Sequence, residues 1–289
     1  MTVKEYIDTG TERLLPLYPK KEARALLQMA LESFCQYPDY IYYSDPDRPL
    51  PFAHLPDLQR ALDDLCRHRP IQYIAGKTLF EGCTIHVREG VLIPRPETEE
   101  LVRLAKSSLS DADSILDLCT GSGAIAVVLA KAFPQAKVYG VDILENALDV
   151  AKENSLFNKV EIHFYKADIL NAPNFSELPF LPHSFDLIIS NPPYVCNAEK
   201  AQMCHNVLLY EPHVALFVPD KDPLLFYRAL ADWGKALLKD GGRLMAEINE
   251  QMDHKVRELL KHKGYSSIEI HTDLNGKPRI CSALSGKRD

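Results

Sequence analysis

Short apolar runs alternate with segments of helical periodicity over most of this chain. The runs that read as strands cover residues 114–118, 137–142, 160–166, 185–190 and 242–249, and the helical segments cover 124–133, 145–155, 224–238 and 251–263. Residues 268–271 and 280–284 are expected to form a terminal strand pair. Such alternation predicts a mostly parallel sheet with helices on both faces, so the larger part of the chain is expected to be of the α/β class.

The residues before this region have a different character. Thr2 and Glu5 have the spacing of a capping box, and apolar residues recur at helical spacing within 23–34 and 55–65, which predicts a helical bundle. Glycines at positions 76, 82 and 90 then separate two β-like runs, 84–87 and 91–93, which predicts a hairpin connector. A further helix is expected from about residue 94 to 109.

The bulk composition excludes several classes of protein. The chain has 289 residues and a net charge of −7, which argues against binding that depends on nucleic-acid phosphates. No apolar run approaches the roughly 20 residues of a membrane span, and no signal-peptide core is evident. Seven scattered cysteines without a C-x-x-C pair fit reduced thiols, and the ten histidines lack metal-site spacing. We therefore expect a cytoplasmic protein without a metal site.

The loop Asn191-Pro192-Pro193-Tyr194 follows the fourth strand candidate, where open α/β sheets bind their ligands. Two prolines have fixed φ and no N–H, so the loop is rigid and its carbonyl oxygens are free to accept hydrogen bonds. Asn191 adds a side-chain carbonyl and Tyr194 a flat face. The loop is thus expected to cradle a planar group that carries an NH2. The alternatives are a strand-terminating turn for the loop and a core aromatic role for Tyr194.

A second loop, residues 119–123, joins the first strand candidate to its helix. Its two glycines allow a sharp turn and the close approach of a ligand, and the spacing also fits a dinucleotide-binding G-x-G-x-x-A motif. Asp142 ends the next strand, where an acid can bind ribose hydroxyls, unless it only caps the following helix. Asp168 follows the third strand and is placed for the adenosine, unless it is a solvated loop acid. The candidate cofactor residues are Cys119, Thr120, Gly121, Ser122, Gly123, Asp142, Asp168, Ile169 and Asn191.

With these motifs in place, the chain resembles the class I S-adenosylmethionine-dependent methyltransferases. More narrowly it resembles the PrmC/HemK family, which methylates the glutamine of the Gly-Gly-Gln motif in peptide chain release factors. Two positions depart from the commonest pattern, because Cys119 and Asn249 stand where glycine is more usual. The resemblance rests on residues 69–76, 91–99, 117–126, 141–142, 191–194, 210–212 and 247–251.

The resemblance implies a Rossmann-like methyltransferase domain with a mostly parallel seven-stranded sheet over residues 94–289. It also implies a small helical bundle for substrate recognition over 1–75 and a β-hairpin connector over 76–93. The implied cofactor is S-adenosyl-L-methionine, with S-adenosyl-L-homocysteine as product, and the implied partners are release factors, with no nucleic acid and no membrane.

The same resemblance assigns roles to the proline loop. Asn191, Pro192 and Tyr194 are the implied catalytic residues, and these three with Pro193 form the implied substrate site. The Asn191 side-chain oxygen and the Pro192 carbonyl would each accept one N–H of the substrate amide, and no dedicated base would be needed. Arg95 and Glu97 either face the pocket or the substrate, or merely cap a helix.

Four competing functions remain at this point. A nucleic-acid methyltransferase acting on an exocyclic base amine could use the same cradle, although such enzymes usually add a basic surface. An NAD-linked oxidoreductase could use the glycine loop but leaves the loop at residues 191–194 unexplained. A non-catalytic adaptor would not need the cofactor loop, and the acceptor could also be a ribosomal-protein glutamine.

Overall fold

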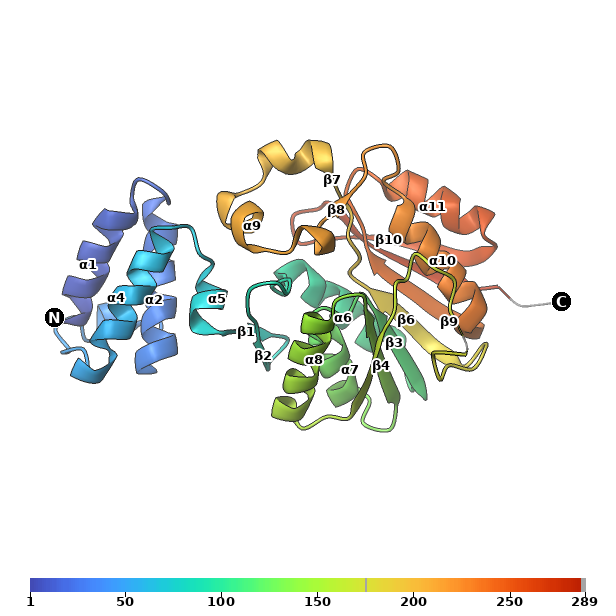
Figure 1. Ribbon diagram of the computed structural model, residues 1–289, viewed down its shortest axis with the longest axis horizontal. Helices are drawn as coiled ribbons and strands as arrows, with labels where there is room; N and C mark the ends of the chain where they lie inside the picture. The colour runs from blue at the N-terminus through green and yellow to red at the C-terminus, as the bar shows by residue number, and fades with distance from the viewer. Residues whose placement is uncertain (175, 287–289) are drawn as a thin grey trace. The chain divides into compact units, whose positions relative to one another are not determined.

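The computed structural model describes residues 1–174 and 176–286 (Figure 1). The chain divides into two compact units. The first comprises Met1–Lys77 with Met203–Glu211, and the second comprises Thr78–Gln202 with Pro212–Asp289. The boundaries expected at residues 75 and 93 remain predictions.

The first unit is helical. Its first helix begins at a capping box, in which Thr2 accepts from the Glu5 backbone N–H while the Glu5 carboxylate accepts from that of Thr2. The apolar residues at helical spacing are buried together in one core of their own, as the periodicity predicts. The helices of this unit are α1 (Val3–Leu14), α2 (Lys20–Cys35), α3 (Ile41–Ser44), α4 (Leu55–Leu65), α5 (Ile71–Ala75) and α9 (His205–Tyr210), with the 3-10 turn η1 (Phe52–His54).

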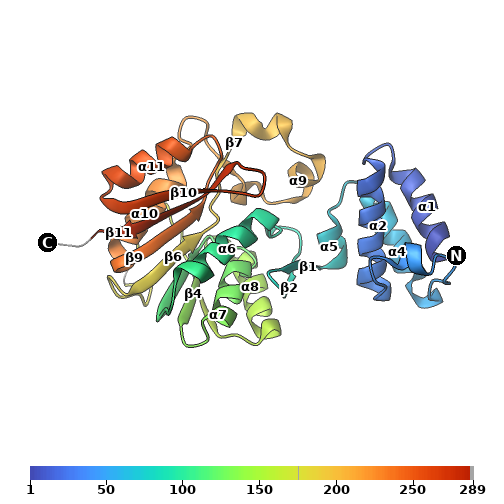
Figure 2. The same ribbon diagram turned by 180° about the vertical axis from the view of Figure 1, so that it is seen from behind.

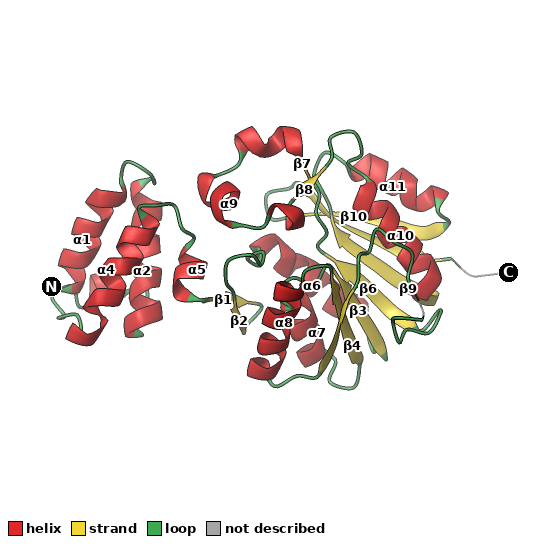
Figure 3. Ribbon diagram, in the orientation of Figure 1, coloured by secondary structure: helices red, strands yellow, loops and turns green. Residues whose placement is uncertain are grey.

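The second unit is built on a seven-stranded sheet in the order β10-β11-β9-β6-β3-β4-β5. Figure 3 shows the strands in yellow with helices around them in red. Strands β9, β6, β3, β4 and β5 are parallel, and β11 is antiparallel to both β9 and β10 (Figure 2). The predicted mostly parallel seven-stranded sheet is therefore confirmed. The strands are β3 (Ser114–Leu118), β4 (Lys137–Asp142), β5 (Ile162–Lys166), β6 (Phe185–Ser190), β9 (Leu238–Glu247), β10 (Tyr265–Thr272) and β11 (Pro278–Ser285).

Helices cover both faces of this sheet. Because successive side chains of a strand point to opposite faces, Leu244 and Ala246 of β9 pack in one core with α10 and α11, whereas Met245 lies against Ser108 of α6. Both faces being buried explains why these strands are continuous apolar runs. The helices are α6 (Pro96–Ser108), α7 (Ala124–Ala132), α8 (Glu145–Asn158), α10 (Leu225–Leu237) and α11 (Asp253–His262).

The hairpin expectation was wrong in one strand. The two strands that pair are β1 (Lys77–Phe80) and β2 (Cys83–His86), and residues 91–93 belong to no strand. Val91 is buried all the same, because it packs against Ala147 and Val150 of α8. Val91 is therefore buried by contact with a helix and not by pairing in a strand. The remaining short elements are the paired strands β7 (Val195–Cys196) and β8 (Phe217–Val218), and the 3-10 turns η2 (Asn197–Gln202) and η3 (His213–Ala215).

Two further features concern membrane-spanning helices and the cysteines. Within the described residues, the structure has no helix with the length and apolarity that a membrane span requires. All seven cysteines are free thiols.

Gly123 precedes α7 in a conformation that no other residue type fits easily. Its φ is +77°, and an added Cβ would lie 2.9 Å from the Ala151 Cβ. We expect Gly123→Ala to lower the free energy of unfolding by roughly 2–4 kcal/mol, because left-handed strain and overpacking add. Gly241→Ala is the matched control, since Gly241 has φ +75° but no atom within 4 Å of the added Cβ. Urea denaturation measures both, and equal losses would refute the packing argument.

Candidate active site

A pocket opens at the carboxyl ends of four parallel strands. Strand β3 lies between β4 and β6, so the chain reverses its direction of growth across the sheet beside β3, where such folds bind ligands. Each of these strands contributes residues to the pocket wall. The contributing residues are Cys119 and Gly121 after β3, Asp142 at the end of β4, Asp168 and Ile169 after β5, and Asn191 and Pro193 after β6.

Asp142 organises the glycine loop as well as lining the pocket. Its Oδ2 accepts the Gly121 N–H at 2.8 Å, and its Oδ1 accepts the Leu144 N–H at 2.9 Å. The carboxylate keeps lone pairs with which it can accept further hydrogen bonds. Burial raises the pKa of Asp142, and these backbone hydrogen bonds oppose that rise. The residue at the cap position of α8 is Leu144, so Asp142 is not a simple helix cap.

Cys119 occupies a backbone position that favours glycine. Its φ is +59°, in the left-handed region, where a side chain costs about 1–2 kcal/mol. This explains why glycine is the more usual residue in this loop, and it shows that the chain folds with cysteine there. Burial raises the pKa of the Cys119 thiol well above its ordinary value, so the thiol is a poor nucleophile.

Three residues of the predicted cofactor loop are not part of the pocket wall. The Thr120 hydroxyl donates to Asp117 at 2.6 Å, and the Ser122 carbonyl accepts from the Asn154 side chain at 2.9 Å. Gly123 lies against Ala151. These residues hold the shape of the loop, and a direct contact with the cofactor stays a prediction for them.

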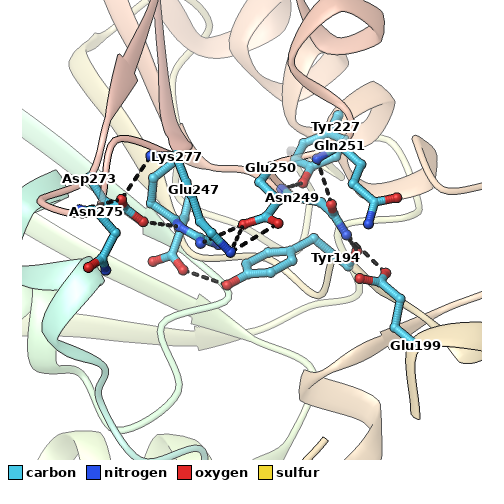
Figure 4. A network of polar contacts seen from close by, with 11 residues as sticks. Tyr194, Glu199, Tyr227, Glu247, Asn249, Glu250, Gln251, Asp273, Asn275 and Lys277 are labelled. Atoms are coloured by element: carbon cyan, nitrogen blue, oxygen red, sulfur yellow. Dashed lines mark hydrogen bonds and ion pairs between the residues drawn. The ribbon is translucent and has the colours of Figure 1, made fainter. Parts of the chain in front are cut away.

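The loop at residues 191–194 is held by a buried carboxylate, Glu247, at the end of β9. The Tyr194 hydroxyl donates to Glu247 Oε1 at 2.6 Å (Figure 4). The Asn191 Nδ2 donates to Thr98 Oγ1 at 3.0 Å, and Thr98 donates to Glu247 Oε2 at 2.7 Å. Pro192 is buried beside them but is not part of the pocket wall.

Known proteins that are similar to this chain are methyltransferases. The methyltransferase domain model matches residues 109–277. The release factor glutamine methyltransferase of Flavobacterium psychrophilum is 38% identical, with 97% of this chain and 98% of that protein covered. That of Bacteroides thetaiotaomicron is 39% identical over 94% of this chain and 96% of its own length.

This chain belongs to the release factor glutamine methyltransferase family. It is an S-adenosyl-L-methionine-dependent methyltransferase. A solved methyltransferase from Pyrococcus furiosus has the same fold, with a TM-score of 0.52 and 18% identity over 72% of this chain and 91% of that one.

Membership in this family does not by itself reveal the apolar part of the pocket wall. Phe226 of α10 carried no sequence signal, because an aromatic residue in an amphipathic helix is typical of a core. Pro212 lies in a stretch that resembles the family, but the resemblance implies no role for it. The wall residues that no motif of the sequence marks as site residues are Gly90, Val91, Leu92, Ile143, Leu144, Ala147, Ala167, Leu170, Pro212, Val214, Ala215 and Phe226.

Asn249, the second departure from the family pattern, ties the proline loop to its neighbours (Figure 4). Its Nδ2 donates to the Tyr194 carbonyl at 3.2 Å and to Glu199 at 3.0 Å. Its Oδ1 accepts the Gln251 N–H at 2.9 Å. A glycine has no side chain to make these bonds, so Asn249 braces the segment that follows β6.

We expect Asn249→Gly to lower the free energy of unfolding by roughly 2–3 kcal/mol, because about three hydrogen bonds of a buried amide are lost. Asn275→Gly serves as the control, since exposed Asn275 bonds to Asp273 through its backbone N–H. Thermal and urea denaturation of both variants provide the measurement. A midpoint for Asn249→Gly equal to that of the control would show that the brace contributes nothing.

Proposed function

We propose that this protein transfers a methyl group from S-adenosyl-L-methionine to the side-chain amide of the glutamine in the Gly-Gly-Gln motif of peptide chain release factors, in the cytoplasm. The observation that carries this proposal is the hydrogen bonding of the Asn191 side chain. Its NH2 group is already bound by Thr98, which leaves its carbonyl oxygen for a donor in the pocket. An acceptor at that position suits a substrate that presents an NH2. The release factor glutamine methyltransferases that cover nearly the whole chain support the same substrate.

The pocket has the chemistry that S-adenosyl-L-methionine requires. Asp142 retains lone pairs for the ribose hydroxyls, and Ile143, Ile169 and Phe226 offer apolar surface for the adenine. Asp168 accepts the Leu170 N–H at 2.9 Å and retains acceptors toward the adenosine. When bound, the cofactor supplies an electrophilic methyl group on a sulfonium.

The chain's own residues would prepare the amide for attack. An amide nitrogen is a poor nucleophile because its lone pair is delocalised into the carbonyl. The Asn191 oxygen and the Pro192 carbonyl would each accept one N–H, which holds the nitrogen in place and disfavours its planar delocalisation. Tyr194 would pack against the glutamine side chain. No general base is needed before attack, because the N–H becomes acidic once the nitrogen is alkylated. Such positioning is worth up to roughly 7–11 kcal/mol of the barrier.

The same cradle fits the exocyclic amine of a nucleic-acid base, which makes base methylation the second candidate. The net charge of −7 does not favour it, because enzymes that expose a base usually add a basic surface. An acidic enzyme instead complements a basic protein partner.

Methyl transfer from labelled S-adenosyl-L-methionine to a purified release factor tests the proposal. The comparison is a release factor whose Gly-Gly-Gln glutamine is replaced by alanine. Label on the first and none on the second is the expected result. Label on both would place the acceptor elsewhere in the factor, and label on neither, with cofactor binding intact, would overturn the proposed substrate.

A further inference from the structure

We propose that Thr98 and Glu247 are positioning residues that determine which end of the Asn191 amide faces the substrate. The identity of the substrate rests on the proposed function, whereas the orientation of the amide rests on the hydrogen bonds alone. Thr98 lies in the first turn of α6, Asn191 follows β6, and Glu247 ends β9, so three separate elements meet at this point.

The chain of hydrogen bonds starts at Glu247, which is only 1% exposed. A carboxylate can only accept, and both of its oxygens do so, one from Tyr194 at 2.6 Å and one from Thr98 at 2.7 Å. The single hydroxyl proton of Thr98 is therefore committed to Glu247. What Thr98 presents to Asn191 is a lone pair.

This polarity decides the orientation of the Asn191 amide. Only the NH2 end of the amide can donate to Thr98, and the Asn191 Nδ2 lies 3.0 Å from the Thr98 Oγ1. Rotating the amide by half a turn would place its oxygen against the Thr98 oxygen and leave the buried Thr98 acceptor unpaired. Such a loss disfavours the flipped form by roughly 5- to 150-fold. Glu247 thus keeps the carbonyl of Asn191 directed away from Thr98, as the proposed acceptor role requires.

The same carboxylate also positions Tyr194 by accepting from its hydroxyl (Figure 4). One group therefore aligns both polar ends of the proline loop. A role in folding alone would not require this polarity, since a neutral side chain of the same size could fill the space. Burial, the larger influence, raises the pKa of Glu247, and the Tyr194 and Thr98 hydroxyls and the Arg279 charge lower it. The charge of Glu97 acts with burial.

Protonation of Glu247 reverses the direction of the hydrogen bonds that run from Asn191 through Thr98 to Glu247. A protonated carboxyl can donate to Thr98, which frees the Thr98 hydroxyl to donate to the Asn191 oxygen and thereby flips the amide. Turnover should therefore fall as the pH drops through the raised pKa of Glu247. The isosteric variant Glu247→Gln has no such proton equilibrium, so its turnover should lack this acid limb.

The decisive pair of variants is Thr98→Val and Thr98→Ser, with release factor as substrate. Valine removes the hydroxyl at nearly constant volume, and we expect kcat to fall roughly 10- to 50-fold while the dissociation constant of the cofactor changes by less than about threefold. Serine restores the hydroxyl and should recover most of the lost turnover. Denaturation midpoints of all variants exclude unfolding. If Thr98→Val turned over at the wild-type rate, or if serine failed to rescue a folded enzyme, the proposal would be overturned.

A second readout does not depend on the substrate. The side-chain NH2 signals of Asn191 in a 15N-labelled sample are assigned by their absence in Asn191→Asp. We expect them to be protected from solvent exchange in the wild type and in Thr98→Ser, and unprotected in Thr98→Val. If this pattern holds while release factor is not methylated, the proposed function fails and the positioning role stands. Signals that are equally exposed in all three proteins would overturn the positioning role even if release factor is methylated.

Discussion

Asn191→Ala should lower the turnover number by roughly 10²–10³-fold, the size of effect seen when one preorganised polar group is removed from a transition state. The dissociation constant of S-adenosyl-L-methionine should stay within about threefold of the wild-type value. The Asn191 oxygen acts on the substrate amide, whose geometry matters most as the nitrogen becomes tetrahedral. Its loss therefore affects the transition state more than either ground state.

Single-turnover methylation and calorimetric titration of the cofactor separate these two quantities. Asn197→Ala is the matched control, because the Asn197 side chain also bonds within this segment, to the Val218 carbonyl at 3.0 Å. It should retain turnover, since Asn197 is exposed and not part of the pocket wall. A loss of cofactor affinity as large as the loss of turnover would show that Asn191 serves the cofactor and not the acceptor amide.

Asp142→Ala should have the opposite signature and weaken cofactor binding by roughly 10²–10³-fold, because two hydrogen bonds to a charged acceptor are lost. The variant also releases the Gly121 and Leu144 backbone N–H groups, which loosens the loop beside the pocket. Turnover at saturating cofactor should fall much less. Titration with S-adenosyl-L-homocysteine, which has the same ribose, gives the affinity without catalysis.

The chain offers a close control for the structural part of that loss. Asp186, near the start of β6, likewise accepts two backbone N–H groups, from Asp113 at 2.8 Å and Ser114 at 3.0 Å. It lies at the amino ends of the strands, opposite the pocket. Asp186→Ala should destabilise the fold and leave the cofactor affinity unchanged. If both variants bound the cofactor equally well, the ribose role of Asp142 would be wrong.

The local pattern of apolar residues predicts the strands that are buried on both faces and the helices that are buried on one face. Strands β3, β4 and β6 have the bounds that their apolar runs predict, and Asp142 lies in the pocket wall because a residue at the carboxyl end of a parallel strand must lie near that edge. The run at 91–93 misled, since Val91 is buried by a helix. Periodicity over three residues cannot distinguish these two environments.

The support of the proline loop could not be predicted in the same way. Thr98 and Glu247 are 149 positions apart, and they meet only because β9 is placed next to β6 and α6 lies against β9. Nothing in the spacing of residues along the chain specifies which strands become neighbours across the sheet. The stretches that contain both residues resembled the family, but the resemblance alone assigned them no contact.

The order of strands in the sheet also has a consequence for the newly synthesised chain. Most of the pocket wall comes from the ends of β3, β4 and β5 and from the residues that follow them, which are synthesised early, whereas Glu247 lies at the end of β9 and is synthesised late. A nascent chain that has emerged only through β6 would carry Asn191 with neither orientation of its amide favoured. We expect methyl transfer to be the last property acquired during synthesis, so that partly made chains do not modify their substrate.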